Sequence, residues 1–412
     1  MGLVVKKFGG TSVGDLSRIH HVANLVHDYK QKTGNDVVVV VSAMAGETNR
    51  LIDLAKSCVA RPEPRELDVL VSTGEQVSTS LLSMALMAQG SKAKSFSARQ
   101  AGISTNTSFT KAQIEEIQDE RIRESIAAGF IPVVAGFQGI NQSGDITTLG
   151  RGGSDITAVA LAAALKADAC YIYTDVDGVY STDPRVCPEA TRLDRICHEE
   201  MLEFSSMGAK VLHPRSVYFA MAYHVPLCVL STFEPGEGTW IVKEEELMEK
   251  PIVTGVTYRT DEAKITISKL PSDPKALSTL FSVMAEHGIF IDMITQTGFD
   301  GSKTDISFTV MDDDSTNALE IVQQLVPELG AQGAECDRDI AKISIIGVGM
   351  RYHSGVASQM FEALASENIG VEMISTSEIK VSVVVPKKYW EVAVRTLNQS
   401  FCSHNIEVSV EK

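Results

Sequence analysis

Two glycine-rich segments in the first half of the chain carry residue types that bind and neutralise phosphate groups. The first, residues 7–12 (KFGGTS), follows a short apolar stretch and precedes a helical pattern. Adjacent glycines at Gly9 and Gly10 let backbone amides approach an anion, and a helix N-terminus adds partial positive charge. Lys7 could then neutralise charge on a phosphoryl group during its transfer. Taken alone, the pattern fits an ordinary strand-to-helix turn with a solvated lysine better than a phosphate site.

The second segment, residues 149–158 (LGRGGSDITA), gives a stronger signal. Ser154 is predicted to cap the Ala-rich helix that follows, which leaves other amides free to face an anion. Arg151 supplies a planar guanidinium group suited to a carboxylate or a phosphate. Asp155 could stabilise the helix dipole, hold Mg²⁺ or orient Lys7. Two such turns with opposite charges indicate a phosphoryl-transfer site, although the chain has neither a GxxxxGK[ST] nor a GxGxxG motif.

Three further segments offer groups for a nucleotide or a small substrate. Residues 174–185 (TDVDGVYSTDPR) contain a tyrosine for stacking and an arginine for phosphates, and they lack the later acidic positions of a calcium loop. Residues 42–49 and 73–78 combine hydroxyl groups with the carboxylate of Glu75. Hydroxyls and a carboxylate suit the ammonium and carboxylate groups of an amino acid, but each loop also fits a simple helix cap.

The elements that must position these residues alternate between strand and helix. Residues 37–41, 131–136 and 169–174 read as buried strands, and residues 15–32 and 155–167 read as helices. Such alternation predicts a mainly parallel sheet with helices on both faces. Ligands in these folds lie where loops leave the carboxyl ends of the strands, which is where both glycine-rich segments fall.

An internal repeat follows a charged run at residues 243–251. Residues 263–267 (AKITI) recur as 341–345 (AKISI), and residues 289–294 (IFIDMI) recur as 369–374 (IGVEMI), at offsets of 78 and 80. Each copy reads as strand, amphipathic helix and two further strands. The sequence therefore predicts two small βαββαβ modules that associate with one another or with another chain.

Composition excludes several classes of protein. The 412 residues include 53 acidic and 37 basic side chains, giving a net charge of −16. This charge argues against nucleic-acid and membrane-surface binding, and no apolar run reaches the length of a membrane span. The seven cysteines are dispersed without a CxxC pair, which predicts reduced thiols, no zinc site and a cytoplasmic location.

Together, residues 7–12, 150–155, 174–185 and 208–214 (GAKVLHP) resemble the aspartate kinase family, a branch of the amino-acid kinases. The repeats resemble tandem ACT domains, and residues 369–380 are similar to the family's second copy. The resemblance covers essentially the whole chain, in order. It implies an α/β fold: a carbamate-kinase-like sandwich with a mainly parallel central sheet, followed by two α+β, ferredoxin-like βαββαβ ACT domains.

The same resemblance implies domain boundaries. The catalytic domain would span 1–245 and a linker 246–262. The first ACT domain would span 263–337, completed by a strand at 404–412, and the second would span 338–403. In that arrangement the second ACT domain is inserted into the first.

The activity implied is transfer of the γ-phosphoryl group of MgATP to the β-carboxylate of L-aspartate, with Mg²⁺ carried by ATP rather than held by protein side chains alone. The implied catalytic residues are Lys7 and Asp155. The implied aspartate-binding residues are Ser42, Thr48, Glu75, Arg151 and Ser154. The implied ATP-binding residues are Lys7, Gly9, Gly10, Thr174, Asp175, Tyr180, Arg185 and Lys210.

Regulation and assembly are implied as well. Lysine, threonine or both would act as feedback effectors at the ACT domains. The implied effector contacts are Asp273, Ile291, Asp292, Met293, Gln296, Glu372 and Met373, of which the two methionines also fit an ordinary core. The assembly would be a homodimer through the ACT domains, or an α2β2 tetramer with a short subunit starting near Met248.

Two alternatives stay open on sequence grounds. A kinase acting on glutamate, acetylglutamate or UMP would share the glycine-rich turns, but such relatives generally lack the tandem repeat. A non-catalytic amino-acid sensor would have a vestigial kinase domain. The joint presence of Lys7, Arg151 and Asp155 argues against the sensor, because no structural role requires all three.

Overall fold

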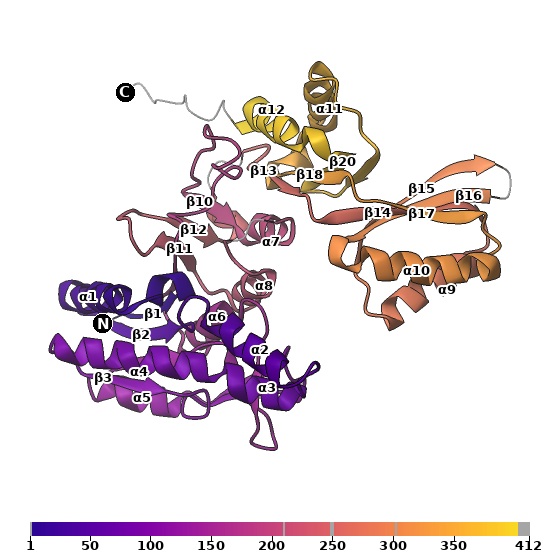
Figure 1. The fold of residues 1–412 in the computed structure, drawn as a ribbon. Coiled ribbons are helices and arrows are strands. Elements are labelled where there is room, and N and C mark those ends of the chain that lie inside the picture. Colours follow the sequence, from indigo (N-terminus) through magenta and orange to yellow (C-terminus); the bar gives the residue numbers. More distant parts are fainter. Residues whose placement is uncertain (1, 209–210, 248–250, 301–302, 403–412) are drawn as a thin grey trace, which may run out of the picture. The chain divides into compact units, whose positions relative to one another are not determined.

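The computed structural model describes residues 2–208, 211–247, 251–300 and 303–402 (Figure 1). Its contacts divide the described chain into two units. The first consists of residues 2–179, 192–206 and 211–247, and the second of residues 180–191, 207–208, 251–300 and 303–402. None of the described helices is long and apolar enough to cross a membrane.

The first unit is built on an eight-stranded sheet in the order β10-β12-β11-β9-β1-β2-β6-β3. Neighbouring strands are parallel except for β11 and β12. This confirms the predicted mainly parallel α/β fold. The strands are β1 (Leu3–Phe8), β2 (Asp36–Val41), β3 (Ala93–Phe96), β6 (Ile131–Ala135), β9 (Ala169–Thr174), β10 (Arg195–Cys197), β11 (Leu227–Ser231) and β12 (Thr239–Val242).

Helices cover the sheet because its central strands are apolar on both faces. Val4 and Phe8 of β1 pack with α1 (Leu16–Thr33) and α4 (Thr73–Ala88) in one buried cluster. Side chains alternate along a strand, so Lys7 points to the other face, where α6 (Gly153–Leu165) packs on β1, β2 and β9. The remaining helices are α2 (Glu47–Cys58), α3 (Pro64–Val71), α5 (Glu120–Ala127), α7 (His198–Ser206) and α8 (Pro214–Tyr223), with 3₁₀ turns η1 (Gly10–Val13) and η2 (Glu244–Glu246).

A second, smaller sheet of the first unit has the order β5-β4-β7-β8. Its β8 contacts α3, and β7 runs directly from the end of β6. It therefore holds the segment that leads from the main sheet into the glycine-rich turn at 150–155. The strands are β4 (Ile103–Thr105), β5 (Ile114–Ile117), β7 (Gln138–Ile140) and β8 (Ile146–Thr148).

The second unit contains the two predicted modules. The first module has the sheet order β15-β16-β14-β17 with two helices packed on one face. Its elements are β14 (Glu262–Pro271), α9 (Pro274–Glu286), β15 (Ile291–Asp300), β16 (Lys303–Met311), α10 (Asp312–Leu329) and β17 (Gly333–Asp337).

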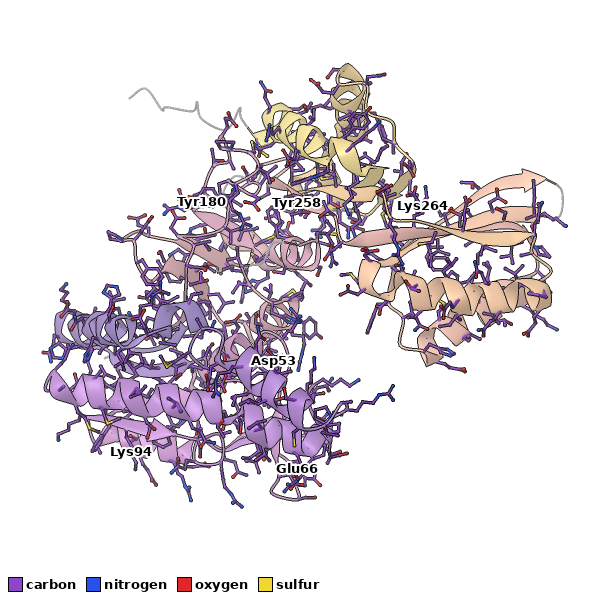
Figure 2. All side chains as sticks on the ribbon, viewed as in Figure 1. Asp53, Glu66, Lys94, Tyr180, Tyr258 and Lys264 are labelled. Atoms are coloured by element: carbon purple, nitrogen blue, oxygen red, sulfur yellow. The ribbon has the colours of Figure 1, made fainter. Side chains whose placement is uncertain are left out.

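The second module has the sheet order β13-β18-β20-β19 and its own apolar core. Tyr258 of β13, labelled in Figure 2, packs on Trp390 at the start of α12, with 4.5 Å between the ring centroids. Its elements are β13 (Gly255–Arg259), β18 (Ile340–Ile346), η3 (Val348–Tyr352), α11 (Val356–Ser366), β19 (Met373–Thr376), β20 (Lys380–Pro386), η4 (Lys387–Tyr389) and α12 (Trp390–Cys402).

The order of the two modules differs from the sequence prediction in one respect. Strand β13 lies within the predicted linker 246–262 but pairs antiparallel with β18, so it belongs to the second module. The first module is thus inserted in the chain between parts of the second, whereas the sequence predicted that the second would be inserted into the first. The predicted closing strand at 404–412 lies outside the described residues, as do Lys210 and Met248.

Candidate active site

A cavity of about 720 Å³ opens in the first unit where the carboxyl ends of β1 and β2 meet the start of α6. It is lined by the 42–49 loop, parts of α3 and α4, and both glycine-rich segments. The predicted site residues that line it are Lys7, Gly10, Ser42, Thr48, Glu75, Arg151, Ser154 and Asp155. The structure therefore brings both predicted catalytic residues and all five predicted substrate-binding residues to one cavity.

Lys7 and Asp155 form an ion pair in this cavity. Lys7 Nζ lies 2.6 Å from Asp155 Oδ1, and the two side chains are only 10% and 12% exposed. Lys7 lies near the end of strand β1, just before the first glycine pair, and Asp155 lies in the first turn of α6. Of the three roles that the sequence left open for Asp155, its position beside Lys7 favours orientation of the lysine.

The first glycine-rich segment forms η1 directly after β1. The Gly9 amide donates to the carbonyl of Tyr173 at 3.2 Å, which ties the segment to β9. Gly10 lines the cavity, and a Cβ atom there would lie 3.0 Å from the carbonyl oxygen of Ala43. Gly10 thus allows the 42–49 loop to approach closely, while the Gly9 amide already has a backbone partner.

The second glycine-rich segment makes a turn that only glycine fits. Gly152 has φ +68°, and a Cβ atom there would lie 2.2 Å from Cβ of His213. Helix α6 begins at Gly153, and its N-cap is Gly152, which has no side chain with which to cap the helix. The prediction of Ser154 as the cap is therefore wrong: Ser154 lies within the first helical turn, 8% exposed, against Gly136. Arg151 projects from the turn as an exposed side chain that lines the cavity.

Glu75 is a buried carboxylate, and only one of its two oxygens is hydrogen-bonded in the described chain. It lies in the first turn of α4 and is 3% exposed. Its Oε1 accepts the Ala43 amide at 3.1 Å, whereas Oε2 has no hydrogen-bond partner in the described chain. Burial raises the pKa of Glu75 from 4.5 to about 7. A carboxylate with a free oxygen in a cavity is suited to receive a ligand's ammonium group.

Two residues that sequence reasoning missed hold the walls of the cavity. Asp68 of α3 is fully buried and accepts the amides of Thr110 and Thr148, both at 2.8 Å, and the Thr148 hydroxyl at 2.7 Å. Burial is the main influence on the pKa of Asp68, and it raises that pKa. Arg215 of α8 donates to the carbonyls of Leu149 and Ala112 at 2.6 and 3.0 Å. Asp68 and Arg215 therefore fix the segment that enters the 150–155 turn.

The remaining predicted ATP-binding residues do not line this cavity. Thr174 is the last residue of β9, and its hydroxyl donates to the carboxylate of the next residue, Asp175, at 3.2 Å. Tyr180 and Arg185 belong to the second unit, where the Arg185 guanidinium pairs with Asp183 at 2.8 Å. Lys210 lies outside the described residues.

The donor groups of the cavity suit a nucleotide phosphate better than a protein-held metal. No group of three or more His, Cys, Asp or Glu residues that could hold a metal ion is found in the described ranges. Lys7 and Arg151 supply positive charge, and of the three carboxylates that line the cavity (Asp68, Glu75 and Asp155), Asp155 is the one paired with Lys7. A divalent ion brought by the phosphates of a nucleotide would need few protein ligands, which fits this set.

The predicted effector residues of the second unit have more than one structural role. Asp273 caps α9 by accepting the Lys275 amide at 2.9 Å, and Ile291 and Gln296 lie on β15. Met293 and Met373 are each 4% exposed and share a small apolar cluster with Ile340 and Val384, so both belong to a core. The acidic residues Asp292 and Glu372 form ion pairs with Lys342 and Lys264 respectively.

Comparisons with known proteins match the whole chain. Residues 2–231 match the model of the amino acid kinase family, and residues 343–401 match an ACT domain model. The chain is 56% identical over 402 residues to an aspartate kinase of Stutzerimonas stutzeri, covering 97% of both chains.

Solved structures give the same result. The chain is similar to Escherichia coli aspartokinase III in complex with aspartate and ADP, with a TM-score of 0.81, 28% identity and coverage of 97% of this chain and 99% of that one. The complex of the same protein with lysine and aspartate gives a TM-score of 0.78, 29% identity and the same coverage.

Proposed function

The chain belongs to the aspartokinases, within the amino acid kinase family, and from that membership we propose how its own residues act in aspartate kinase activity. The reaction transfers the γ-phosphoryl group of ATP to the β-carboxylate of L-aspartate and yields 4-phospho-L-aspartate. The observation that carries the assignment of residues is the shared cavity of Lys7, Asp155, Glu75 and Arg151.

Lys7 is proposed to stabilise the negative charge of the transferring phosphoryl group. Phosphoryl transfer needs positioning and charge neutralisation rather than a covalent nucleophile. The carboxylate of Asp155, 2.6 Å away, holds the lysine ammonium in place at the end of β1. The Gly10 position and the start of α6 would face the phosphates, since both line the cavity.

The substrate aspartate is proposed to lie between Glu75 and Arg151. The free oxygen of Glu75 accepts the ammonium group, and the guanidinium of Arg151 binds the α-carboxylate. Ser42, Thr48 and Ser154 line the same cavity and supply hydroxyl groups. This arrangement leaves the β-carboxylate of the substrate as the group that meets the phosphoryl donor.

The nucleotide is proposed to carry Mg²⁺, which would neutralise phosphate charge when bound. Asp155 is the carboxylate of the cavity beside Lys7 and could contribute to that ion as well as to the lysine. Thr174, Asp175, Tyr180, Arg185 and Lys210 stay proposed nucleotide contacts on the family resemblance alone.

A hydroxamate assay tests the proposed activity directly. The protein is incubated with ATP, Mg²⁺, L-aspartate and hydroxylamine, which converts an acyl phosphate into a hydroxamate that forms a coloured complex with Fe³⁺. Aspartyl hydroxamate is expected, and N-acetylglutamate or glutamate in place of aspartate should give none. Absence of hydroxamate with aspartate would favour the alternative of a non-catalytic amino-acid sensor.

Feedback by lysine, threonine or both is proposed to act through the two modules of the second unit. Support comes from the ACT match and from the lysine complex of the Escherichia coli relative. Gln296 is exposed on β15, the strand that also carries the predicted contacts Asp292 and Met293. Gln296→Ala should reduce inhibition by the effector without lowering uninhibited turnover, and full inhibition of this variant would remove Gln296 from the site.

Assembly and location are proposed on sequence grounds. We expect a homodimer through the ACT modules, or an α2β2 tetramer if translation also starts at Met248. Native purification decides between them, because the tetramer contains a second, short band. A cytoplasmic location is consistent with the seven cysteines, all of which have free thiols in the structure.

A further inference from the structure

The two ACT modules of the second unit are joined by ion pairs that cross between equivalent positions of the repeat. Lys264 of the first module pairs with Glu372 of the second, and Lys342 of the second pairs with Asp292 of the first. Lys264 is the repeat equivalent of Lys342, and Asp292 is the equivalent of Glu372. Between the two pairs lies the apolar cluster that contains Met293 and Met373, which are also equivalent.

This interface uses the helix-free faces of both sheets. Ile265 and Ile343 point toward the helices of their own modules, and strand alternation directs Lys264 and Lys342 to the opposite face. The contacts between β15 and β19 and between β14 and β18 follow the same pattern. The two modules therefore pack as an approximate two-fold pair within one chain.

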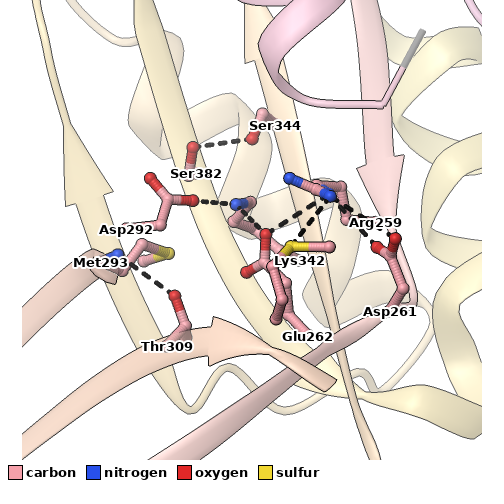
Figure 3. A network of polar contacts seen from close by, with 10 residues as sticks. Arg259, Asp261, Glu262, Asp292, Met293, Thr309, Lys342, Ser344 and Ser382 are labelled. Atoms are coloured by element: carbon pink, nitrogen blue, oxygen red, sulfur yellow. Dashed lines mark hydrogen bonds and ion pairs between the residues drawn. The ribbon is translucent and has the colours of Figure 1, made fainter. Parts of the chain in front are cut away.

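One residue breaks the symmetry. Where the second module has Ile340, in the apolar cluster, the first has Glu262, which is 2% exposed. Lys342 Nζ lies 2.5 Å from Glu262 Oε1 while it also contacts Asp292 (Figure 3). Glu262 Oε2 has no hydrogen-bond partner in the described chain, and Arg259 approaches Oε1 only to 3.5 Å.

The three members of this cluster differ in access to solvent. The side chain of Lys342 is 1% exposed and that of Glu262 is 2% exposed, whereas that of Asp292 is 42% exposed. An external ammonium group can therefore reach Asp292 and cannot reach Glu262. A buried carboxylate at a position that tolerates isoleucine in the other module needs a reason other than packing.

We propose that Lys342 competes with the ammonium group of an amino-acid effector for Asp292, and that Glu262 retains Lys342 when the effector takes Asp292. The inference rests on the proposed effector contact at Asp292 and adds two residues to it. In the unliganded arrangement Lys342 bridges both carboxylates. In the liganded arrangement Lys342 keeps a buried counter-charge in Glu262, whose second oxygen is available to it. The bridge between Lys342 and Asp292 therefore weakens the apparent affinity of the protein for the effector. When the effector displaces Lys342 from Asp292, Glu262 keeps the buried charge of Lys342 paired.

Inhibition titrations of the full chain test this competition. L-lysine and L-threonine are titrated against the wild-type protein, and the one that inhibits is titrated against the double variant Lys342→Met/Glu262→Gln. The double variant removes the competitor and its buried counter-charge together, leaving Asp292 free. The concentration of the amino acid that half-inhibits the double variant should be lower than for the wild type by about fivefold or more, which is the low end of ordinary allosteric coupling. Ser344→Ala, on the same strand and face, is the matched control and should leave the half-inhibitory concentration unchanged.

Lys342→Arg provides a second variant that keeps the charge. An arginine can hold a carboxylate with two hydrogen bonds, so it should raise the half-inhibitory concentration. Opposite shifts in the two variants support the competition. An unchanged half-inhibitory concentration in both, in a protein whose wild type is inhibited, overturns the role of Lys342 while leaving feedback intact. A wild-type protein that forms hydroxamate but is inhibited by neither amino acid overturns the feedback proposal and this inference with it.

Discussion

Lys7 Nζ and Asp155 Oδ1 lie 2.6 Å apart, although their side chains come from a strand and a helix far apart in the sequence. Lys7 lies just before the first glycine-rich turn, and Asp155 lies just after the glycines of the second. Residues of both turns line one cavity. The ion pair is nearly buried, which strengthens its effect on a phosphate that enters beside it. The ion pair therefore holds the positive charge of Lys7 where the negative charge of a phosphate must be neutralised.

Removing the carboxylate partner should impair the lysine without abolishing substrate binding. Asp155→Asn keeps the shape of the side chain but removes the charge that orients Lys7. We expect kcat to fall by about 10²-fold or more while KM for aspartate changes much less, as for loss of preorganised electrostatic groups in other enzymes. Steady-state kinetics of the hydroxamate reaction measures both constants. A rise in KM with unchanged kcat would assign Asp155 to binding instead.

Glu75 should make the use of aspartate depend on pH. Its pKa is raised to about 7 by burial, so the carboxylate form that binds an ammonium group predominates only above that pH. kcat/KM for aspartate should therefore rise with pH between about 5.5 and 7 and level off by about 8. Glu75→Gln should lower kcat/KM and flatten this profile. A variant profile that rises as steeply as the wild type would show that another group controls it.

Arg151 should act on aspartate binding through the geometry of its guanidinium. Arg151→Lys keeps the charge but loses the planar fork, and Arg151→Ala loses both. We expect KM for aspartate to rise in both variants, by about tenfold or more in Arg151→Ala and less in Arg151→Lys, while KM for ATP changes little. Equal increases in both Michaelis constants would instead place Arg151 on the nucleotide phosphates.

Lys6, the neighbour of Lys7, should make stability depend on pH. Its ammonium lies 3.6 Å from the centre of the Tyr29 ring and donates to the Tyr173 hydroxyl at 3.0 Å. Burial lowers the pKa of Lys6 from 10.5 to about 7. Between these values the unfolded chain binds a proton that the folded protein does not, so the free energy of unfolding rises with pH, by at most about 1.4 kcal/mol per pH unit.

The variant Lys6→Met isolates this contribution. It should be more stable than the wild type near pH 7, because an apolar side chain replaces a buried lysine, and the difference should shrink toward pH 9. Denaturant unfolding of both proteins at pH 7 and at pH 9 measures the difference in their free energies of unfolding. A stability difference that does not vary with pH would mean that Lys6 keeps its charge in the folded protein.

Much of the fold and of the cavity can be predicted from local sequence signals. Apolar strand runs and glycine-rich turns are local, and parallel strands bring their carboxyl ends to one edge of the sheet. The amino-acid sequence alone therefore predicts that Lys7 and Asp155 lie close together. The start of α6 is harder to predict. A serine within a glycine-rich turn reads as a cap, but the left-handed conformation of Gly152 places the cap two residues earlier.

Other features depend on partners that are distant in sequence. Asp68 reads as an ordinary charged helix residue, and its partners Thr110 and Thr148 are 42 and 80 residues away. The strand β13 reads as linker because the strand it pairs with, β18, lies beyond the whole first ACT module in the chain. Lys342 reads as a solvated strand residue, since only the packing of the two modules buries it. No local pattern carries such information.

The most direct measurement of the central claim compares two adjacent lysines of β1 in the hydroxamate assay. Lys7 faces the cavity and Lys6 faces the tyrosines on the other side of the sheet, so Lys7→Met and Lys6→Met are matched changes. The account predicts that Lys7→Met lowers kcat by about 10²-fold or more with a smaller change in KM, and that Lys6→Met keeps kcat within about twofold. Unchanged turnover in Lys7→Met would contradict it.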